Sequence, residues 1–365
     1  MTCQNSFIIV QEITFLKIYV MKLIRRFLLK RKIVVTLAVT SSILAFILYQ
    51  NNYQLVESTV TIPHKPNNLD AVLAMPRHLP PGEKPGVVIF VHGDGDINAT
   101  HGGFYRPIWE ALSKAGFSSL SWNKPGVGGA PGNWLQQSMD DRTSEVISAI
   151  DWIKHQPQLD GQRIALWGAS QGGWVLPKVA TRYPDICFMI AVSPAVNWLE
   201  QGRYNTIASM KQKGRSESEI AAELKREQQV LALLDANASF EQYQQKEGNA
   251  ADFTADRWTF VMKNYRSDAT QDLAQVHSPV FLALGGKDIN VDIKNTENEY
   301  RKRLNKAGQL DIKFYPQATH SMLEKSTEDS LIETWYKGLF FPRAIFYPGF
   351  LQDQQDFAWQ HRHCQ

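Results

Sequence analysis

The sequence predicts an α/β fold with a mostly parallel central sheet and helices on both faces. Segments with strand and helix patterns alternate along most of the 365 residues, which is typical of βαβ units. The run GVVIFVHG at 86–93 is continuously apolar and β-branched, as expected for a strand covered on both faces. Two earlier runs, at 56–62 and 70–76, predict an antiparallel pair at the sheet edge.

The remaining elements follow in order. Further strands are expected at 117–122, 163–168, 188–193, 279–285 and 310–316. A helix at 104–116 ends at a glycine, which is a common helix stop. A second helix at 138–156 carries apolar residues at helical spacing and acids in its first turn, and a third is expected at 171–183.

One interval interrupts this alternation. Residues 195–275 contain no good strand, and 216–235 begin with a capping box from Ser216 to Glu219. We expect a helical insertion that caps the carboxyl ends of the strands, where open α/β sheets bind ligands. The α/β core would then comprise 56–194 and 276–365. The alternative is a solvated helical excursion without a role at the site.

The N-terminal part has a different composition from the rest. Residues 1–32 form a basic segment, and 33–50 are predicted to be a transmembrane signal anchor. A cleaved signal peptide and a buried core helix are the alternatives, but no small-x-small cleavage site lies between Ala45 and Tyr53. Basic residues before the apolar run predict a cytoplasmic N-terminus and an extracytoplasmic domain. Translation could start at Met1 or at Met21.

Charge and cysteine content exclude several classes of function. The net charge is +3, and the basic segment accounts for it, so the rest of the chain is slightly acidic and lacks a nucleic-acid-binding stripe. No CxxC motif occurs, and three cysteines do not form a disulfide framework. We expect Cys187 to pack beside a strand, with a bridge to Cys364 as the alternative. No metal or cofactor is expected.

The stretch Gly168-Ala169-Ser170-Gln171-Gly172 directly follows a predicted strand and precedes a predicted helix. A strand, a tight turn that carries serine, and a helix form the context of a nucleophile elbow. The turn would hold Ser170 in a strained conformation with its hydroxyl exposed. Glycines on either side avoid clashes there, so Ser170 is the candidate nucleophile.

A nucleophilic serine needs a base, and the base needs an orienting acid. Asp288 follows the strand at 279–285, and His320 follows the strand at 310–316. The order Ser170, Asp288, His320, each after a strand, predicts a catalytic triad. Asp292 is the reserve acid.

The end of the strand expected at 86–93 and the loop after it read His92-Gly93-Asp94-Gly95 and predict an oxyanion site. Its donors would be the backbone N–H groups of Asp94 and Gln171, with His92 in a structural role. A calcium loop starting at Asp94 is the rival interpretation, but it lacks the required glycine and glutamate. The glycine-rich loop 124–132 lacks the Lys-Ser/Thr pair of a P-loop and is predicted to border the pocket.

These motifs resemble the α/β-hydrolase superfamily over about 56–362, and more narrowly its bacterial prolyl-oligopeptidase-like and serine-aminopeptidase-like branches. In these branches the loop after the fourth strand commonly reads D-K-R-G-x-G-x-S-x-G. Here residues 123–132 read NKPGVGGAPG, so the arginine and serine of that pattern are replaced. Residues 347–360 resemble the last helix of these enzymes. For a bacterial protein, the predicted anchor implies the inner membrane with the domain in the periplasm.

The resemblance implies that Ser170 attacks an acyl carbonyl, that His320 accepts its proton and that Asp288 orients His320. We expect an esterase acting on a small-molecule acyl substrate, with the oligomeric state left open. A serine peptidase acting on short peptides and an acyl thioesterase are alternatives. An aminopeptidase would need a carboxylate, which Glu200, Glu217, Glu219, Glu223 and Glu227 of the insertion offer. A membrane-tethered scaffold with an inactive hydrolase fold is the remaining alternative.

Overall fold

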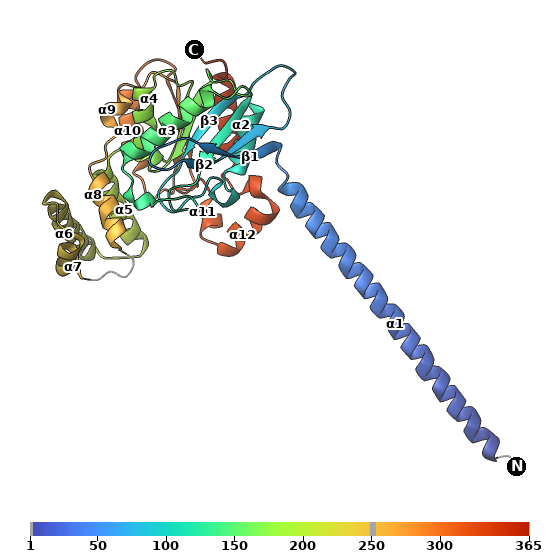
Figure 1. The fold of residues 1–365 in the computed structure, drawn as a ribbon. Helices are drawn as coiled ribbons and strands as arrows, with labels where there is room; N and C mark the ends of the chain where they lie inside the picture. The colour runs from blue at the N-terminus through green and yellow to red at the C-terminus, as the bar shows by residue number, and fades with distance from the viewer. Residues whose placement is uncertain (1–2, 249–252, 365) are drawn as a thin grey trace. The chain divides into compact units, whose positions relative to one another are not determined.

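The computed structural model describes residues 3–248 and 253–364, and the chain divides into two compact units between Asn52 and Tyr53. The described part of the first unit is dominated by one helix, α1 (Cys3–Gln50) (Figure 1). Its segment Met21–Gln50 is long and apolar enough to cross a membrane. A signal sequence near an N-terminus has the same length and composition, so either assignment fits this helix.

The second unit is built on an eight-stranded sheet in the order β1-β2-β4-β3-β5-β6-β7-β8. β1 and β2 are antiparallel to each other, β2 is antiparallel to β4, and the remaining pairs are parallel. Every strand expected from the sequence is present, with ends that shift by at most two residues. The strands are β1 (Leu55–Ile62), β2 (Leu69–Pro76), β3 (Gly86–Val91), β4 (Phe117–Trp122), β5 (Ile164–Ala169), β6 (Met189–Val192), β7 (Val280–Gly285) and β8 (Leu310–Tyr315).

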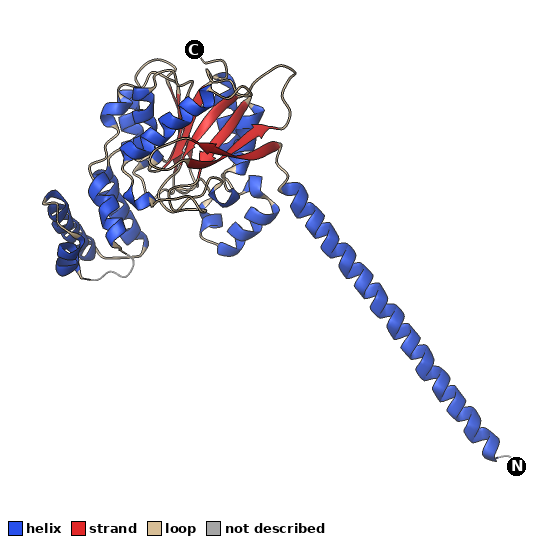
Figure 2. Cartoon of the chain, viewed as in Figure 1, coloured by secondary structure: helices blue, strands red, loops and turns tan. Residues whose placement is uncertain are grey.

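Helices cover both faces of the sheet (Figure 2). Successive residues of β3 alternate between the two cores: Ile89 packs with one helical layer, and Phe90 with the other. The first layer contains α3 (Met139–Lys154), α4 (Gly172–Arg182), α9 (Thr270–Leu273) and α10 (Ile293–Arg303). The second contains α2 (Arg106–Lys114) and α13 (Phe350–Gln360). The predicted α/β fold class is thereby confirmed.

The predicted insertion is helical, and its helices follow β6 and precede β7 in the chain; α5, α6, α7 and α8 are labelled in Figure 1. Ser216 and Glu219 form the expected capping box at the start of α6. Helices of this segment form an apolar cluster of their own around Tyr243 and Trp258, while Phe260 of the same segment packs in the first core of the sheet. The helices of the insertion are α5 (Trp198–Gln212), α6 (Glu217–Asp235), α7 (Phe240–Glu247), α8 (Ala255–Asn264) and, at its end, α9.

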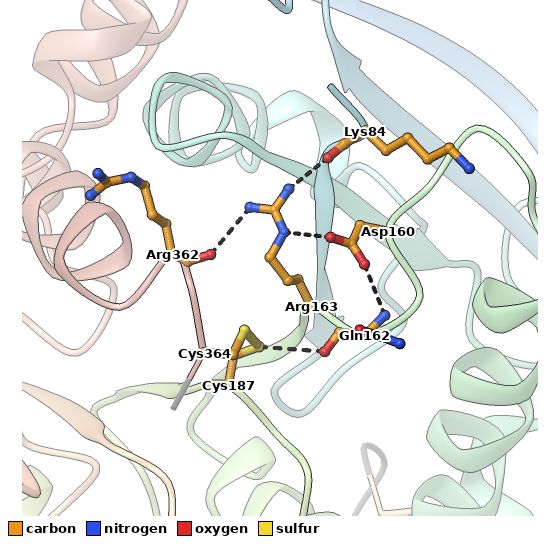
Figure 3. The surroundings of a disulfide bond; sticks show 7 residues. All are labelled: Lys84, Asp160, Gln162, Arg163, Cys187, Arg362 and Cys364. Carbon is orange, nitrogen blue, oxygen red and sulfur yellow. Dashed lines mark hydrogen bonds and ion pairs between the residues drawn. A yellow bond between two sulfur atoms is a disulfide. The ribbon is translucent and has the colours of Figure 1, made fainter. Parts of the chain in front are cut away.

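Cys187 and Cys364 form a disulfide, which corrects the expectation that Cys187 only packs beside a strand (Figure 3). The two Cα atoms lie 4.6 Å apart although 177 residues separate them in sequence. Nearby, the Arg163 guanidinium donates to the carbonyl oxygens of Lys84 and Arg362 and to the Asp160 carboxylate. These bonds hold the C-terminal segment against the base of β5, so the two thiols meet because of tertiary packing that sequence spacing does not reveal.

Two short helices, α11 (Lys325–Glu328) and α12 (Leu331–Phe340), follow β8. Single-turn 3-10 helices at His101–Gly103, Trp134–Gln136 and Pro342–Ala344 complete the described secondary structure.

Candidate active site

Ser170 lies in the turn between β5 and α4, and its φ of 52° places it in the left-handed region that non-glycine residues rarely adopt. The surrounding backbone holds this conformation. The Ser170 N–H donates to the Val192 carbonyl at 3.0 Å, while the Ser170 carbonyl accepts from Gly173 and Ala195. The strained elbow expected from the sequence is therefore present in the fold.

Glycines let the turn pack directly on its neighbours. A Cβ on Gly172 would lie 3.0 Å from the Val91 carbonyl oxygen, and a Cβ on Gly173 would lie 2.5 Å from the Ala195 carbonyl oxygen. A Cβ on Gly168 would meet Leu176 at 3.0 Å. At Gly173 the start of α4 thus lies closer to the backbone that follows β6 than a side chain permits, and at Gly172 its contact with the end of β3 leaves almost no room for one.

Asp288 and His320 are joined as the sequence analysis expected. His320 Nδ1 lies 2.8 Å from Asp288 Oδ2. Asp288 Oδ1 accepts the N–H groups of Asn290 and Val291, and the side chain is fully shielded from solvent. With its second oxygen held by two backbone donors, the carboxylate has one fixed orientation toward the imidazole.

The loops that carry Asp288 and His320 touch through their backbones. A Cβ on Gly285 would lie 2.5 Å from the Thr319 carbonyl oxygen, and a Cβ on Gly286 would lie 2.4 Å from that of Pro316. The two glycines of the GGKD motif therefore allow acid and base to meet. Asp292, the reserve acid, instead caps the start of α10 by accepting from the N–H groups of Lys294 and Asn295, so it has a structural role.

Ser170 and His320 line one cavity of about 690 Å³ at the carboxyl edge of the sheet. Ser170 Oγ and the His320 imidazole are not hydrogen-bonded to each other, and catalytic contacts of this kind often tighten only in the complex with substrate. Apolar side chains form much of the wall: Ile97, Phe104, Tyr105, Ile108, Trp167, Val192, Leu323, Phe346 and Phe350. The cavity beside the candidate nucleophile therefore has a largely apolar wall, as ligand-binding pockets commonly do.

The two predicted oxyanion donors flank Ser170. Asp94 lies on the cavity wall, and Gln171 is buried at the start of α4. Within the ranges 3–248 and 253–364, no acceptor is recorded for the backbone N–H of either residue. A helix N-terminus with a free N–H is suited to stabilising negative charge.

Two buried cations hold the loop that carries Asp94, and sequence reasoning missed both. Lys124 Nζ donates to the carbonyl oxygens of Gly93 at 2.6 Å and Gly95 at 2.8 Å. Arg142 of α3 donates to the carbonyl oxygen of His92 and, at 3.3 Å, to Oε1 of Gln171. Lys124 thus holds the backbone on both sides of Asp94, and Arg142 holds the side chain of Gln171.

Burial lowers the pKa of Lys124 well below its usual value, and the Arg142 charge lowers it further. Burial likewise raises the pKa of Glu145, the nearby acid, which accepts from Trp122 Nε1. In the sequence, the one indication of a role for Lys124 was its place directly after Asn123 in the glycine-rich loop. Arg142 carried no signal, because a helical arginine is ordinarily exposed.

His92 has the structural role expected of it. The buried ring lies 3.0 Å from the Tyr105 hydroxyl and 2.7 Å from the Trp122 carbonyl oxygen. Burial lowers its pKa well below the usual value. No group of three or more His, Cys, Asp or Glu side chains arranged for a metal ion occurs among the described residues.

The helical insertion reaches the site through side chains. Tyr204 donates its hydroxyl to the Asp288 carbonyl oxygen at 3.0 Å, and Asn205 Nδ2 donates to the carbonyl oxygen of Ile289. Arg257 of α8 forms a two-bond ion pair with Asp94, with contacts of 2.6 and 3.0 Å. Burial raises the pKa of Asp94, but the Arg257 hydrogen bonds and charge outweigh it, so the pKa is lowered.

Comparison with known proteins identifies the family of the chain. A sequence profile described as serine aminopeptidase, S33, matches residues 82–327, about two thirds of the chain. An uncharacterized 31.7 kDa protein of Escherichia coli is 23% identical over 193 residues, which is 49% of this chain and 65% of that protein. The acylamino-acid-releasing enzyme of Rattus norvegicus is 23% identical over 270 residues, which is 72% of this chain but 32% of the enzyme. The chain thus spans less than two thirds of the length of these curated relatives.

Solved structures share the fold. An esterase of Pyrococcus furiosus aligns with a TM-score of 0.51 at 17% identity, covering 80% of this chain and 92% of the esterase. The acylaminoacyl peptidase of Pyrococcus horikoshii aligns with a TM-score of 0.52 at 13% identity, covering 85% of this chain and 42% of the peptidase. The resemblance to α/β-hydrolases stated from the motifs is confirmed.

Proposed function

The chain belongs to the serine aminopeptidase S33 family of serine hydrolases, and on that premise we propose that it cleaves carboxylic esters of apolar acyl groups. One observation carries the proposal: a serine with positive φ shares an apolar cavity with a histidine whose Nδ1 is held by a buried carboxylate. This combination of nucleophile, base and orienting acid is the arrangement required for acyl transfer.

In the proposed reaction, Ser170 Oγ attacks the ester carbonyl carbon while His320 Nε2 takes the hydroxyl proton. Asp288 keeps Nδ1 protonated and stabilises the imidazolium. The oxyanion accepts from the N–H groups of Asp94 and Gln171. When the tetrahedral intermediate collapses, His320 returns the proton to the leaving alcohol. Water, deprotonated by His320, then attacks the acyl-enzyme and releases the acid and free Ser170.

The cavity wall favours an ester over a peptide with a free amino end. An ammonium group needs a carboxylate partner when it leaves water. Among the described residues, Asp94 is the one acidic side chain on the wall, and Arg257 already neutralises it. The glutamates suggested for an aminopeptidase do not line the cavity. They bind other side chains or the backbone of the insertion and its surroundings: Glu200, Glu217, Glu219, Glu223 and Glu227.

One peptidase activity is compatible with this wall. A peptide whose amino end is acylated carries no ammonium, and the rat relative is named an acylamino-acid-releasing enzyme. Release of an N-acyl amino acid is therefore the second candidate function.

We further propose that residues 33–50 remain as an uncleaved signal anchor, with a cytoplasmic N-terminus and residues 56–365 outside the cytoplasm. The Cys187–Cys364 disulfide supports this location, because such bonds persist in oxidising compartments. Within the outer part, 195–275 would act as a cap on a core formed by 56–194 and 276–365. Resistance of the full chain to alkaline extraction from membranes is the expected result; release into the soluble fraction would refute the anchor.

A fluorophosphonate probe tests the nucleophile. Wild type should be labelled, Ser170→Ala should not, and Ser321→Ala should be labelled like wild type because Ser321 lines the same cavity without a proposed role. An unlabelled but folded wild type would overturn the serine hydrolase proposal. Values of kcat/KM for p-nitrophenyl esters, free aminoacyl arylamides and N-acetylated arylamides then separate the candidates. A higher kcat/KM on the free aminoacyl arylamides than on the p-nitrophenyl esters and the N-acetylated arylamides would contradict the ester and acylamino proposals.

A further inference from the structure

Helix α12 exposes an apolar stripe to solvent. Its members have large exposed fractions and are spaced one and four residues apart, so they share one helical face. They are Leu331 (86% exposed), Ile332 (84%), Trp335 (74%) and Tyr336 (51%). A contiguous patch of this kind on a folded domain marks a surface that contacts an apolar partner.

The polar face of α12 points inward. Thr334 Oγ1 donates to the Thr327 carbonyl oxygen at 2.7 Å, and Lys337 Nζ donates to Thr327 Oγ1 at 2.8 Å. Glu333 accepts from the Thr327 hydroxyl and pairs with Lys337. This polarity is the reverse of that of a helix on a domain surrounded by water, which buries its apolar face.

The segment that carries α12 begins and ends at the wall of the cavity. Leu323 and Phe346 form an isolated antiparallel bridge, and both line the cavity wall. The chain between them leaves the wall, forms α11 and α12, and returns. An object bound to α12 would therefore contact a segment that joins the cavity wall at both of its ends.

The end of this segment also packs on the first residues of the domain. The Arg343 guanidinium lies 4.6 Å from the centre of the Tyr53 ring and pairs with Glu110 at 2.6 Å. Glu110 in turn accepts the Gln54 N–H. Tyr53 follows the last residue of α1, Gln50, by three peptide links, which reach roughly 11 Å at most. A membrane span that ends at Gln50 would thus bring this part of the domain to the lipid headgroups.

We propose that the apolar stripe of α12 inserts into the surface of the bilayer that α1 spans, so that the cavity receives ester substrates dissolved in that bilayer. This inference rests on the proposed anchor and on the proposed hydrolase activity. Tryptophan and tyrosine favour the membrane interface because their rings are apolar and their N–H or O–H groups reach water. Trp335 and Tyr336 supply these two side-chain types to the exposed stripe.

Quenching of tryptophan fluorescence by brominated phosphatidylcholine tests the contact in the full chain reconstituted into vesicles. None of the ten tryptophans lies in residues 1–52, so α1 contributes no tryptophan signal. Trp335→Phe should lose more than half of the lipid-dependent quenching. Trp359→Phe, which removes another exposed ring (52%) on α13, should lose almost none. Equal loss in both variants, or no quenching in wild type, would overturn the proposal.

Activity separates this inference from the proposed function. The triple variant Leu331→Gln, Ile332→Gln, Trp335→Gln should lose about tenfold or more in hydrolysis of a long-chain ester held in vesicles, yet keep wild-type kcat/KM on a soluble short-chain ester. No activity of wild type on either ester would instead refute the proposed function, while the quenching result would still report on the contact. If Trp335 is shielded from brominated lipid and cross-linking joins two chains, a second copy covers the stripe and the membrane contact is wrong.

Discussion

The carboxyl edge of the sheet and the helical insertion contribute to the site in different ways. At the sheet edge, loops meet backbone to backbone, and a Cβ on Gly173, Gly285 or Gly286 would lie within 2.6 Å of a carbonyl oxygen. The insertion instead reaches the site through the ends of side chains, as Tyr204 and Arg257 do.

The two kinds of contact differ in how rigidly they hold the residues of the site. Backbone contacts without free space hold their partners rigidly, because a small displacement creates a clash. Contacts through long side chains adapt, since a terminal group can rotate while the backbone stays in place. We therefore expect changes at the sheet edge to lower kcat and changes in the insertion to act mainly on KM.

The largest effect is expected from Asp288→Asn. The amide can no longer hold the imidazole in the required tautomer, so kcat on a p-nitrophenyl ester should fall roughly 10³- to 10⁴-fold with a similar KM. Asp292→Asn is the matched control, because asparagine also caps helices, and its kcat should stay within about twofold of wild type. A near-normal kcat in Asp288→Asn would show that Asp288, at the carboxyl edge of the sheet, is not the acid that orients His320.

Lys124→Met tests whether the buried cation positions the oxyanion loop. The variant lacks the two hydrogen bonds from Lys124 to the Gly93 and Gly95 carbonyl oxygens, so the Asp94 N–H should no longer be oriented toward the oxyanion. We expect kcat to fall roughly 10- to 100-fold. KM should change little, because the cavity wall is retained. Lys178→Met, which removes a partly exposed lysine paired with Asp140 and Asp272, should leave kcat unchanged. A rise in KM at constant kcat would contradict a positioning role.

The same variant makes a prediction for pH dependence. Burial lowers the pKa of Lys124 in the folded state below the unfolded value of about 10.4. Between these two values the unfolded state binds more protons, so this lysine makes the free energy of unfolding rise with pH. Denaturant unfolding from pH 7 to pH 10 should therefore show a smaller upward slope in Lys124→Met than in wild type. Identical slopes would place the charged lysine in a more polar environment.

The smallest effect is expected from Arg257→Met in the insertion. Its ion pair with Asp94 is partly exposed, so stability should change little. Loss of the link between α8 and the oxyanion loop should raise KM several-fold while kcat stays within about threefold. Arg266→Met removes a more exposed pair of the same insertion, with Asp235, and should alter neither constant. A large loss of kcat in Arg257→Met would contradict the expectation that the insertion acts mainly on KM and the sheet edge on kcat.

Several parts of this molecule could be predicted because they depend on local patterns. Strand positions follow from apolar runs such as 86–91, and the elbow around Ser170 follows from glycines that flank a serine between strand and helix. The pairing of Asp288 with His320 follows from their places after neighbouring strands. Asp292 shows the limit of such reasoning, since a helix cap and a catalytic acid can carry the same residue in the same loop.

Local patterns are enough to predict the order of strands and helices, the candidate triad and the apolar N-terminal helix, because periodicity and turn chemistry act over a few residues. The contacts of Lys124 and Arg142 with the oxyanion loop, the Cys187–Cys364 disulfide and the outward apolar face of α12 became visible in the folded chain alone. Each of these depends on segments far apart in the chain being brought together. Such contacts are set by the packing of the whole core, which no local pattern encodes.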